Sequence, residues 1–136
     1  MRIVTKVLAA VGAAILLAGC AAAPGETAKP PGAEIGIQVL GVELLADGDI
    51  ARLNYRVVDI KIARTAFDHE VRLSPSDGHR TLDIMQAGRL GPLRQRPSAT
   101  GKKQFILFPN HGRVLTRGSE AILLVGDARI TGIPVS

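Results

Sequence analysis

The chain has 136 residues, of which 17 are Lys or Arg and 12 are Asp or Glu, with one cysteine and no tryptophan. One cysteine excludes a disulfide within the chain, and this length suits one small domain with a single core. The net charge of +5 falls to +3 after residue 19, because the first 19 residues hold two basic residues and no acid. So mild a charge argues against a nucleic-acid-binding protein.

The N-terminal segment has the pattern of a secretory leader. Arg2 and Lys6 form its basic start, and residues 7–18 form an apolar run. About 12 apolar residues fall within the roughly 7–15 of a signal peptide, whereas a membrane-spanning helix needs about 20. Two alternatives stay open, an ordinary secreted protein cut after small residues and an uncleaved anchor.

The leader ends in Leu17-Ala18-Gly19-Cys20. This string resembles the lipobox of bacterial lipoproteins, in which a diacylglyceryl group is joined to the cysteine sulfur and the leader is removed before it. The resemblance implies a signal peptide over residues 1–19, a covalent lipid on Cys20 and a lipid-anchored place in the cell envelope. Ala21 after the cysteine favours the outer membrane, facing the periplasm, if the source is diderm.

Residues 20–34 are predicted to be the acylated cysteine followed by a tether. This stretch contains Pro24-Gly25 and Pro30-Pro31-Gly32 with few bulky apolar residues. Proline-rich composition makes such a segment semi-extended, at about 3.1 Å per residue. The tether would hold the domain of residues 35–136 away from the bilayer.

The first half of that domain is predicted to be mostly strand. Alternating apolar residues over 35–44 change parity at Gly41, which predicts a bulged strand. The most regular alternation of apolar and polar residues, over residues 51–57, predicts a strand with one solvent-exposed face. Ile60, Ala63 and Phe67 recur at helical spacing, which predicts one or two helical turns.

Residues 71–85 predict a hairpin. Asp77-Gly78 favours a two-residue type I′ turn, which pairs Ser76 with His79. The same register pairs Arg72 with Asp83 on one face of the hairpin. On the other face it places two aliphatic pairs, Leu73 with Leu82 and Val71 with Ile84. This agreement between charge and hydrophobicity supports the register.

The second half of the domain begins with a long connection over residues 87–103. Strands are predicted at 103–108, 120–125 and 128–135, with a short edge piece at Val114-Leu115. Six or seven short strands and one helical turn predict an all-β fold, an antiparallel β-sandwich of immunoglobulin-like architecture. The cysteine pair and tryptophan of antibody domains are absent.

Several strings of the domain resemble a group of uncharacterised bacterial envelope proteins. These strings are Tyr55-Arg56-Val57-Val58-Asp59, Gly91-Pro92-Leu93-Arg94-Gln95, Phe105-Ile106-Leu107-Phe108-Pro109-Asn110-His111-Gly112, Gly118 and Gly126-Asp127. The resemblance implies one compact domain and carries no activity.

Motifs for catalysis or metal binding are not evident in the sequence. It lacks a Gly-x-Ser-x-Gly motif. His69 and His79 would lie about 23 Å apart in the predicted hairpin, too far to share a zinc ion. We therefore expect no enzymatic activity, no metal and no cofactor beyond the lipid on Cys20.

Charge is uneven along the chain, because no acid occurs between Asp83 and Glu120. Seven basic residues in this interval are candidates for contact with an anionic partner: Arg89, Arg94, Arg96, Lys102, Lys103, Arg113 and Arg117. Arginine suits bidentate contact with carboxylate or phosphate. The alternative interpretation is a solvated loop whose charges prevent edge-to-edge pairing of sheets.

The predicted function is therefore a non-enzymatic interaction module on a membrane-anchored lipoprotein. It would dock a protein or an anionic envelope component through the loop 88–103 and the turn 110–117. One alternative is a small-ligand carrier or enzyme with a pocket at one end of the sandwich. Another is a subunit of a larger envelope assembly that binds through an open sheet edge.

Overall fold

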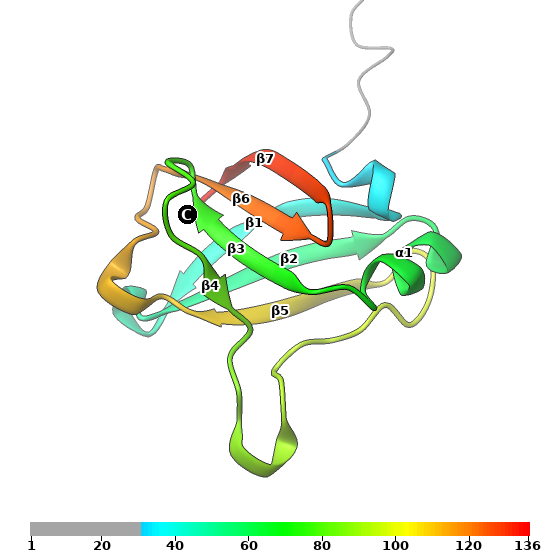
Figure 1. Ribbon diagram of the computed structural model, residues 1–136, viewed down its shortest axis with the longest axis horizontal. Helices are drawn as coiled ribbons and strands as arrows, with labels where there is room; N and C mark the ends of the chain where they lie inside the picture. Colours follow the sequence, from blue (N-terminus) through cyan, green and yellow to red (C-terminus); the bar gives the residue numbers. More distant parts are fainter. Residues whose placement is uncertain (1–30) are drawn as a thin grey trace, which may run out of the picture.

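Two antiparallel sheets pack face to face in the computed structural model, which describes residues 31–136 (Figure 1). The predicted leader, Cys20 and most of the predicted tether lie outside the described residues. The strands are β1 (Ile37–Leu45), β2 (Ile50–Val57), β3 (Val71–Pro75), β4 (Leu82–Asp83), β5 (Lys103–Pro109), β6 (Glu120–Val125) and β7 (Ala128–Pro134). The α-helix is α1 (Ile60–Ala66), and 3-10 turns occupy Ala33–Ile35, Ala46–Gly48, Gly88–Leu90 and His111–Arg113.

The strand order confirms the predicted sandwich. One sheet has the order β1-β2-β5 and the other β4-β3-β6-β7. Lettered A, B, C, C′, E, F and G along the chain, these sheets are A-B-E and C′-C-F-G, an immunoglobulin-like arrangement. The long connection from β4 to β5 crosses from one sheet to the other.

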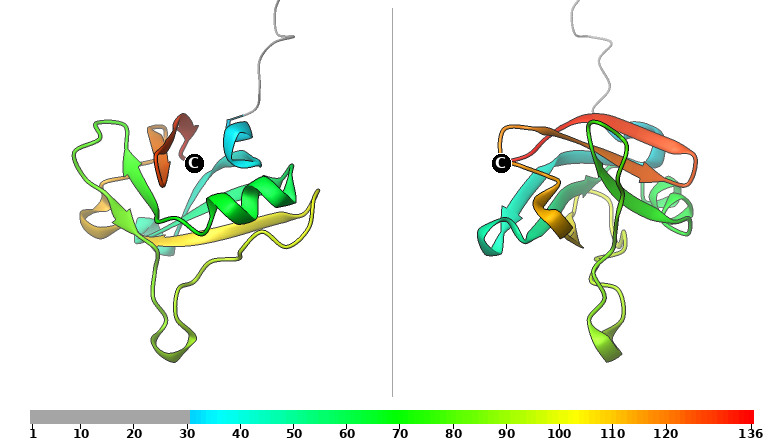
Figure 2. Two further views of the ribbon diagram at one scale, coloured as in Figure 1. Left: turned by 45° about the vertical axis from the view of Figure 1, so that its right-hand side comes forward. Right: turned by 60° about the vertical axis from the view of Figure 1, so that its left-hand side comes forward.

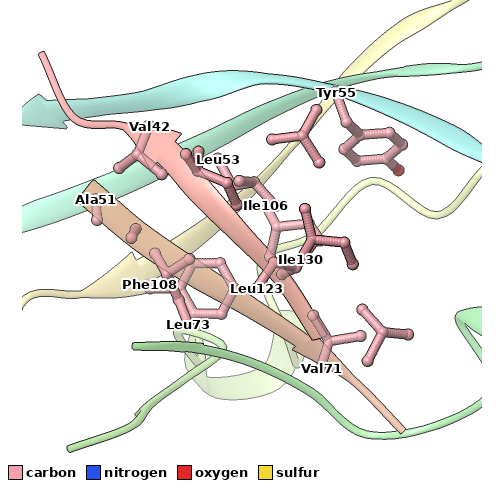
Figure 3. Packing of buried hydrophobic residues seen from close by; sticks show 14 of the residues in the cluster. Val42, Ala51, Leu53, Tyr55, Val71, Leu73, Ile106, Phe108, Leu123 and Ile130 are labelled. Carbon is pink, nitrogen blue, oxygen red and sulfur yellow. The ribbon is translucent and has the colours of Figure 1, made fainter. Parts of the chain in front are cut away.

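The core lies between the sheets and contains the buried apolar side chains of both (Figure 3). In β2, Ala51, Leu53, Tyr55 and Val57 are buried, while the residues between them are half-exposed. Tyr55 packs against Phe67, with ring centroids 5.3 Å apart. Phe67 follows α1 and is fully buried, so the short helix closes one end of the core.

Gly41 produces the predicted bulge in β1. The β1–β2 register shifts between Val39 and Gly41, and Gly41 has φ +146°. The extra residue lets both Val39 and Val42 point into the core, although they are three positions apart. Leu40 is left 39% exposed on the outer face.

The predicted β3–β4 hairpin is correct in part of its register and wrong in its turn. Arg72 pairs with Asp83 and Leu73 with Leu82, as predicted. However, β4 has only two residues, so Ile84 does not pair with Val71, and Asp77 lacks the positive φ that a type I′ turn requires. The Pro75 carbonyl instead accepts a hydrogen bond from Gly78, which starts a wider loop.

The helix prediction is confirmed. Asp59 caps α1, because its carboxylate accepts hydrogen bonds from the backbone N–H groups of Lys61 and Ile62. Ala63 and Phe67 are buried, and Ile60 packs against the same cluster.

Both edges of the three-stranded sheet are partly covered. Along β1, Val39 and Ile37 donate to the carbonyls of Pro31 and Gly32, and the C-terminal Ser136 exchanges backbone hydrogen bonds with the same strand. Along β5, the segment 93–95 forms backbone hydrogen bonds. Pro31 and Gly32 are therefore part of the folded domain, which extends to the N-terminal side of residue 35.

Candidate functional site

The seven basic residues predicted for anionic contact do not form one surface. Lys102 and Lys103 lie where β5 begins, whereas Arg113 and Arg117 follow its other end (Figure 1). The length of β5 separates the two groups by about 20 Å. The structure therefore divides the loop and the turn that the sequence suggested as a common docking surface.

Arg89 lies apart from both groups. It belongs to the Gly88–Leu90 turn at the tip of a loop that projects from the sandwich (Figure 2). A hydrogen bond from the Ala87 amide to the Gly91 carbonyl closes this loop. Its neighbour Leu90 is 83% exposed.

Arg94 and Arg96 lie on the segment that pairs with β5. Arg96 forms an ion pair with Asp68, with Nη2 and Oδ1 2.5 Å apart. Arg94 is half-buried, and burial lowers its pKa, with a further lowering from the nearby charge of Arg96. The hydroxyl of Tyr55 donates to the carbonyl of Gln95, between these two arginines. The two residues are thus partly built into the fold.

Lys102 and Lys103 instead join three cations that were not predicted as site residues from the sequence. Arg56 at the end of β2 pairs directly with Lys103 of β5, and the amide of Val57 donates to the Lys102 carbonyl. Arg64 of α1 reaches across to the carbonyl of Ser98. We call the cations carried by the end of β2, by α1 and around the start of β5 the basic end: Arg56, Lys61, Arg64, Lys102 and Lys103.

The cations of the basic end have no ion-pair partner among residues 31–136. In the same part of the chain, Arg52, Arg72, Arg96 and Arg113 each lie within 4.0 Å of a carboxylate. Among nearby acids, Asp59 caps α1, Glu34 lines the hollow beside Lys61, and Asp68 is held in an ion pair with Arg96. Arg56 and Lys103 lie directly opposite each other on the adjacent strands β2 and β5. Like charges in this arrangement destabilise a sheet.

Buried polar groups hold the backbone beside the basic end. Gln104 is 6% exposed, and its amide donates to the carbonyl of Arg96 at 2.6 Å. Its side-chain oxygen accepts from the amide of Ser98 at 3.0 Å and from the Ser98 hydroxyl. These bonds fix the path of the chain from Arg96 to Lys103.

Apolar side chains accompany the cations. Val58 is 48% exposed and Ile62 is 45% exposed, although both are aliphatic. Ile62 also lines an open hollow of about 500 Å³ between the Ala33–Ile35 turn and α1, together with Glu34, Lys61 and His69. The basic end therefore combines positive charge with exposed hydrocarbon.

The opposite end of the sandwich is organised around Asn110. This residue is 3% exposed, and its side-chain amide donates to the carbonyls of Gly48 and Leu115. Its side-chain oxygen accepts from the amide of Leu115 at 3.0 Å. The predicted strand at Val114-Leu115 is therefore wrong, because the backbone amide and carbonyl of Leu115 bond to the Asn110 side chain rather than to a neighbouring strand.

His69 and His79 are both exposed, and residues 31–136 contain no cluster of three potential metal ligands. The helices described in this range are all too short or too polar to cross a bilayer.

No family model, curated protein or solved structure matches the chain. The lipobox and the resemblance to uncharacterised envelope proteins stay predictions from the sequence.

Proposed function

We propose that this chain is a lipid-anchored lipoprotein of the cell envelope whose β-sandwich is a non-enzymatic docking module. The string Leu17-Ala18-Gly19-Cys20 supports the anchor. The basic end supports the docking role and takes the place of the wider loop surface that the sequence suggested. Its partner would carry carboxylate or phosphate groups, as an anionic envelope component or an acidic face of a protein.

The observation that carries the docking role is the pair formed by Arg56 and Lys103. Two cations directly opposite in a sheet repel each other, and no carboxylate in the described residues lies within ion-pair distance of either. An anion placed over the pair would replace repulsion with attraction. The guanidinium groups of Arg56 and Arg64 also offer the bidentate geometry that carboxylates and phosphates accept.

The anchor is tested by Cys20→Ser in the full chain. Without the thiol no lipid can be attached, so the protein should leave the membrane fraction and lack the added lipid mass. The measurements are fractionation at high salt and intact-protein mass spectrometry. A Cys20→Ser chain that stays firmly in the membrane fraction with an unchanged mass would refute the anchor.

Docking is tested in the mature chain, residues 20–136, carrying Cys20→Ser so that the lipid does not mask weak binding. One variant combines Lys61→Gln, Lys102→Gln and Lys103→Gln. The matched control combines Arg80→Gln, Arg89→Gln and Arg117→Gln, which removes the same charge from exposed positions elsewhere. Co-sedimentation with envelope membranes and with isolated sacculi at low salt should fall for the first variant only. Equal sedimentation of both variants and the parent contradicts the proposal.

A further inference from the structure

We infer that the basic end binds the anionic phospholipid surface of the bilayer that holds the chain's own lipid anchor. This inference rests on the proposed function and names the partner of the same surface. It follows from where the chain enters the domain, from the exposed aliphatic side chains and from the balance of charge.

The chain enters the domain at the basic end. The Ala33–Ile35 turn lies beside α1, on the same side of the sandwich in both views of Figure 2. Gly36 ties this entry to the end of β2, because its carbonyl accepts from the amides of Val58 and Asp59. Ten residues separate Cys20 from Pro31. Even fully extended, the chain from Cys20 to Pro31 reaches at most about 40 Å, so a lipid on Cys20 limits how far this end can lie from the bilayer.

The exposed aliphatic residues distinguish a lipid surface from a purely ionic partner. Only four large apolar side chains in residues 31–136 are more than a third exposed, and Val58 and Ile62 are two of them. The others, Leu40 and Leu90, lie on the outer sheet face and on the projecting loop. Aliphatic groups flanked by lysines suit the boundary between headgroups and acyl chains. A polysaccharide or a bare carboxylate would gain nothing from them.

The charge at this end favours an anionic surface. The five cations of the basic end outnumber Asp59 and Glu34 by three, and Asp68, just after α1, is already paired with Arg96. Each Lys or Arg close to an anionic membrane strengthens partition by about fivefold. This attraction is weak for a free protein in salt, but an anchored domain is already confined beside the surface.

The experiment uses the mature lipidated chain reconstituted into vesicles of phosphatidylcholine alone or with about one third phosphatidylglycerol. A fluorophore is placed at Thr100→Cys, at the basic end, or at Ser76→Cys, in the turn beyond the other end of β3. Quenching by headgroup-labelled lipid reports which end faces the bilayer. The Thr100 probe should be quenched more strongly when phosphatidylglycerol is present, and the Ser76 probe should not.

Two sets of variants separate charge from hydrocarbon. Lys61→Gln, Lys102→Gln and Lys103→Gln together should weaken partition of the Cys20→Ser chain onto phosphatidylglycerol vesicles by roughly a hundredfold, and the Arg80, Arg89, Arg117 control should not. Val58→Ser should weaken partition severalfold at both low and high salt. It removes hydrocarbon that the bilayer would bury, and this contribution does not depend on salt. Leu90→Ser, on the projecting loop, is its control and should change nothing.

Equal quenching of the Thr100 probe with and without phosphatidylglycerol overturns the inference. If the Cys20→Ser chain nevertheless sediments with sacculi through the basic end, the docking role survives and the partner is the cell wall. If it binds neither sacculi nor membranes, the docking role fails as well.

Discussion

Each end of this sandwich holds a buried side-chain amide, but the two ends differ in how their charged side chains are paired. At the Asn110 end, one buried amide satisfies groups of Gly48 and Leu115, and Arg113 pairs with Asp49 at 3.3 Å. At the basic end, two cations face each other across β2 and β5 with no ion-pair partner in the described residues. Polar groups that satisfy one another stabilise the fold, whereas unmatched charges of one sign are suited to an external partner. The Asn110 end therefore contributes to stability, and the basic end is the part that we propose for binding.

The largest effect is expected from Asn110→Ala. Three backbone groups would lose their partner where water cannot replace it easily, so the free energy of unfolding should fall by about 2–4 kcal/mol. Urea denaturation followed by circular dichroism measures the loss. His111→Ala, at the exposed neighbouring position, is the control and should change stability by less than about 0.5 kcal/mol. A negligible effect of Asn110→Ala would remove the contrast between the two ends.

Gln104→Ala should lower stability by about 1–3 kcal/mol, because the backbone groups of Arg96 and Ser98 lose their hydrogen bonds to this buried amide. The loss should be local, so hydrogen exchange at the Ser98 amide should accelerate much more than exchange in β6. Uniform acceleration throughout both sheets would show instead that Gln104 supports the whole core.

Tyr55 should make stability depend on alkaline pH. Its burial raises the pKa of the phenol above its ordinary value near 10, so the folded protein holds this proton more tightly than the unfolded chain. The stabilisation is complete below pH 10 and is lost as pH rises towards the folded-state pKa, by about 1.4 kcal/mol per pH unit.

Tyr55→Phe is the control for this pH dependence and should abolish the slope. Tyr55 is the only tyrosine in the chain, so the near-ultraviolet absorbance of tyrosinate reports its ionisation directly. Ionisation of the folded protein near pH 10, as in a free peptide, would contradict the expectation.

The smallest expected effect is a gain in stability rather than a loss. Lys103→Glu would place an opposite charge across from Arg56, so stability should rise by up to about 0.5 kcal/mol at low salt while binding to anionic vesicles falls. Lys102→Glu is the control, since residue 102 has no cross-strand partner in the β2–β5 register. Lower stability of Lys103→Glu would show that the like-charged pair is not a cost to the fold.

Local patterns were sufficient for much of the fold. Period-two alternation identified β2, the parity change located the bulge at Gly41, and helical spacing found α1. Matching charge and hydrophobicity aligned Arg72 with Asp83. Each of these features depends on neighbouring residues, which is why the sequence alone predicted them. The predicted two-residue turn was wrong because pairing of β3 with β4 ends at Leu73 and Leu82, so a longer loop joins the two strands.

The candidate site depended on tertiary structure. Alternation placed Arg56 on a wet face of its strand, but it could not show that Lys103 lies opposite, because β2 and β5 are paired by the packing of two distant segments. The same packing separated Lys103 from Arg113 by the length of β5 and buried Asn110 among groups remote in sequence. A strand's own sequence determines which side chains share a face, whereas its neighbours in the sheet are decided only when the core assembles.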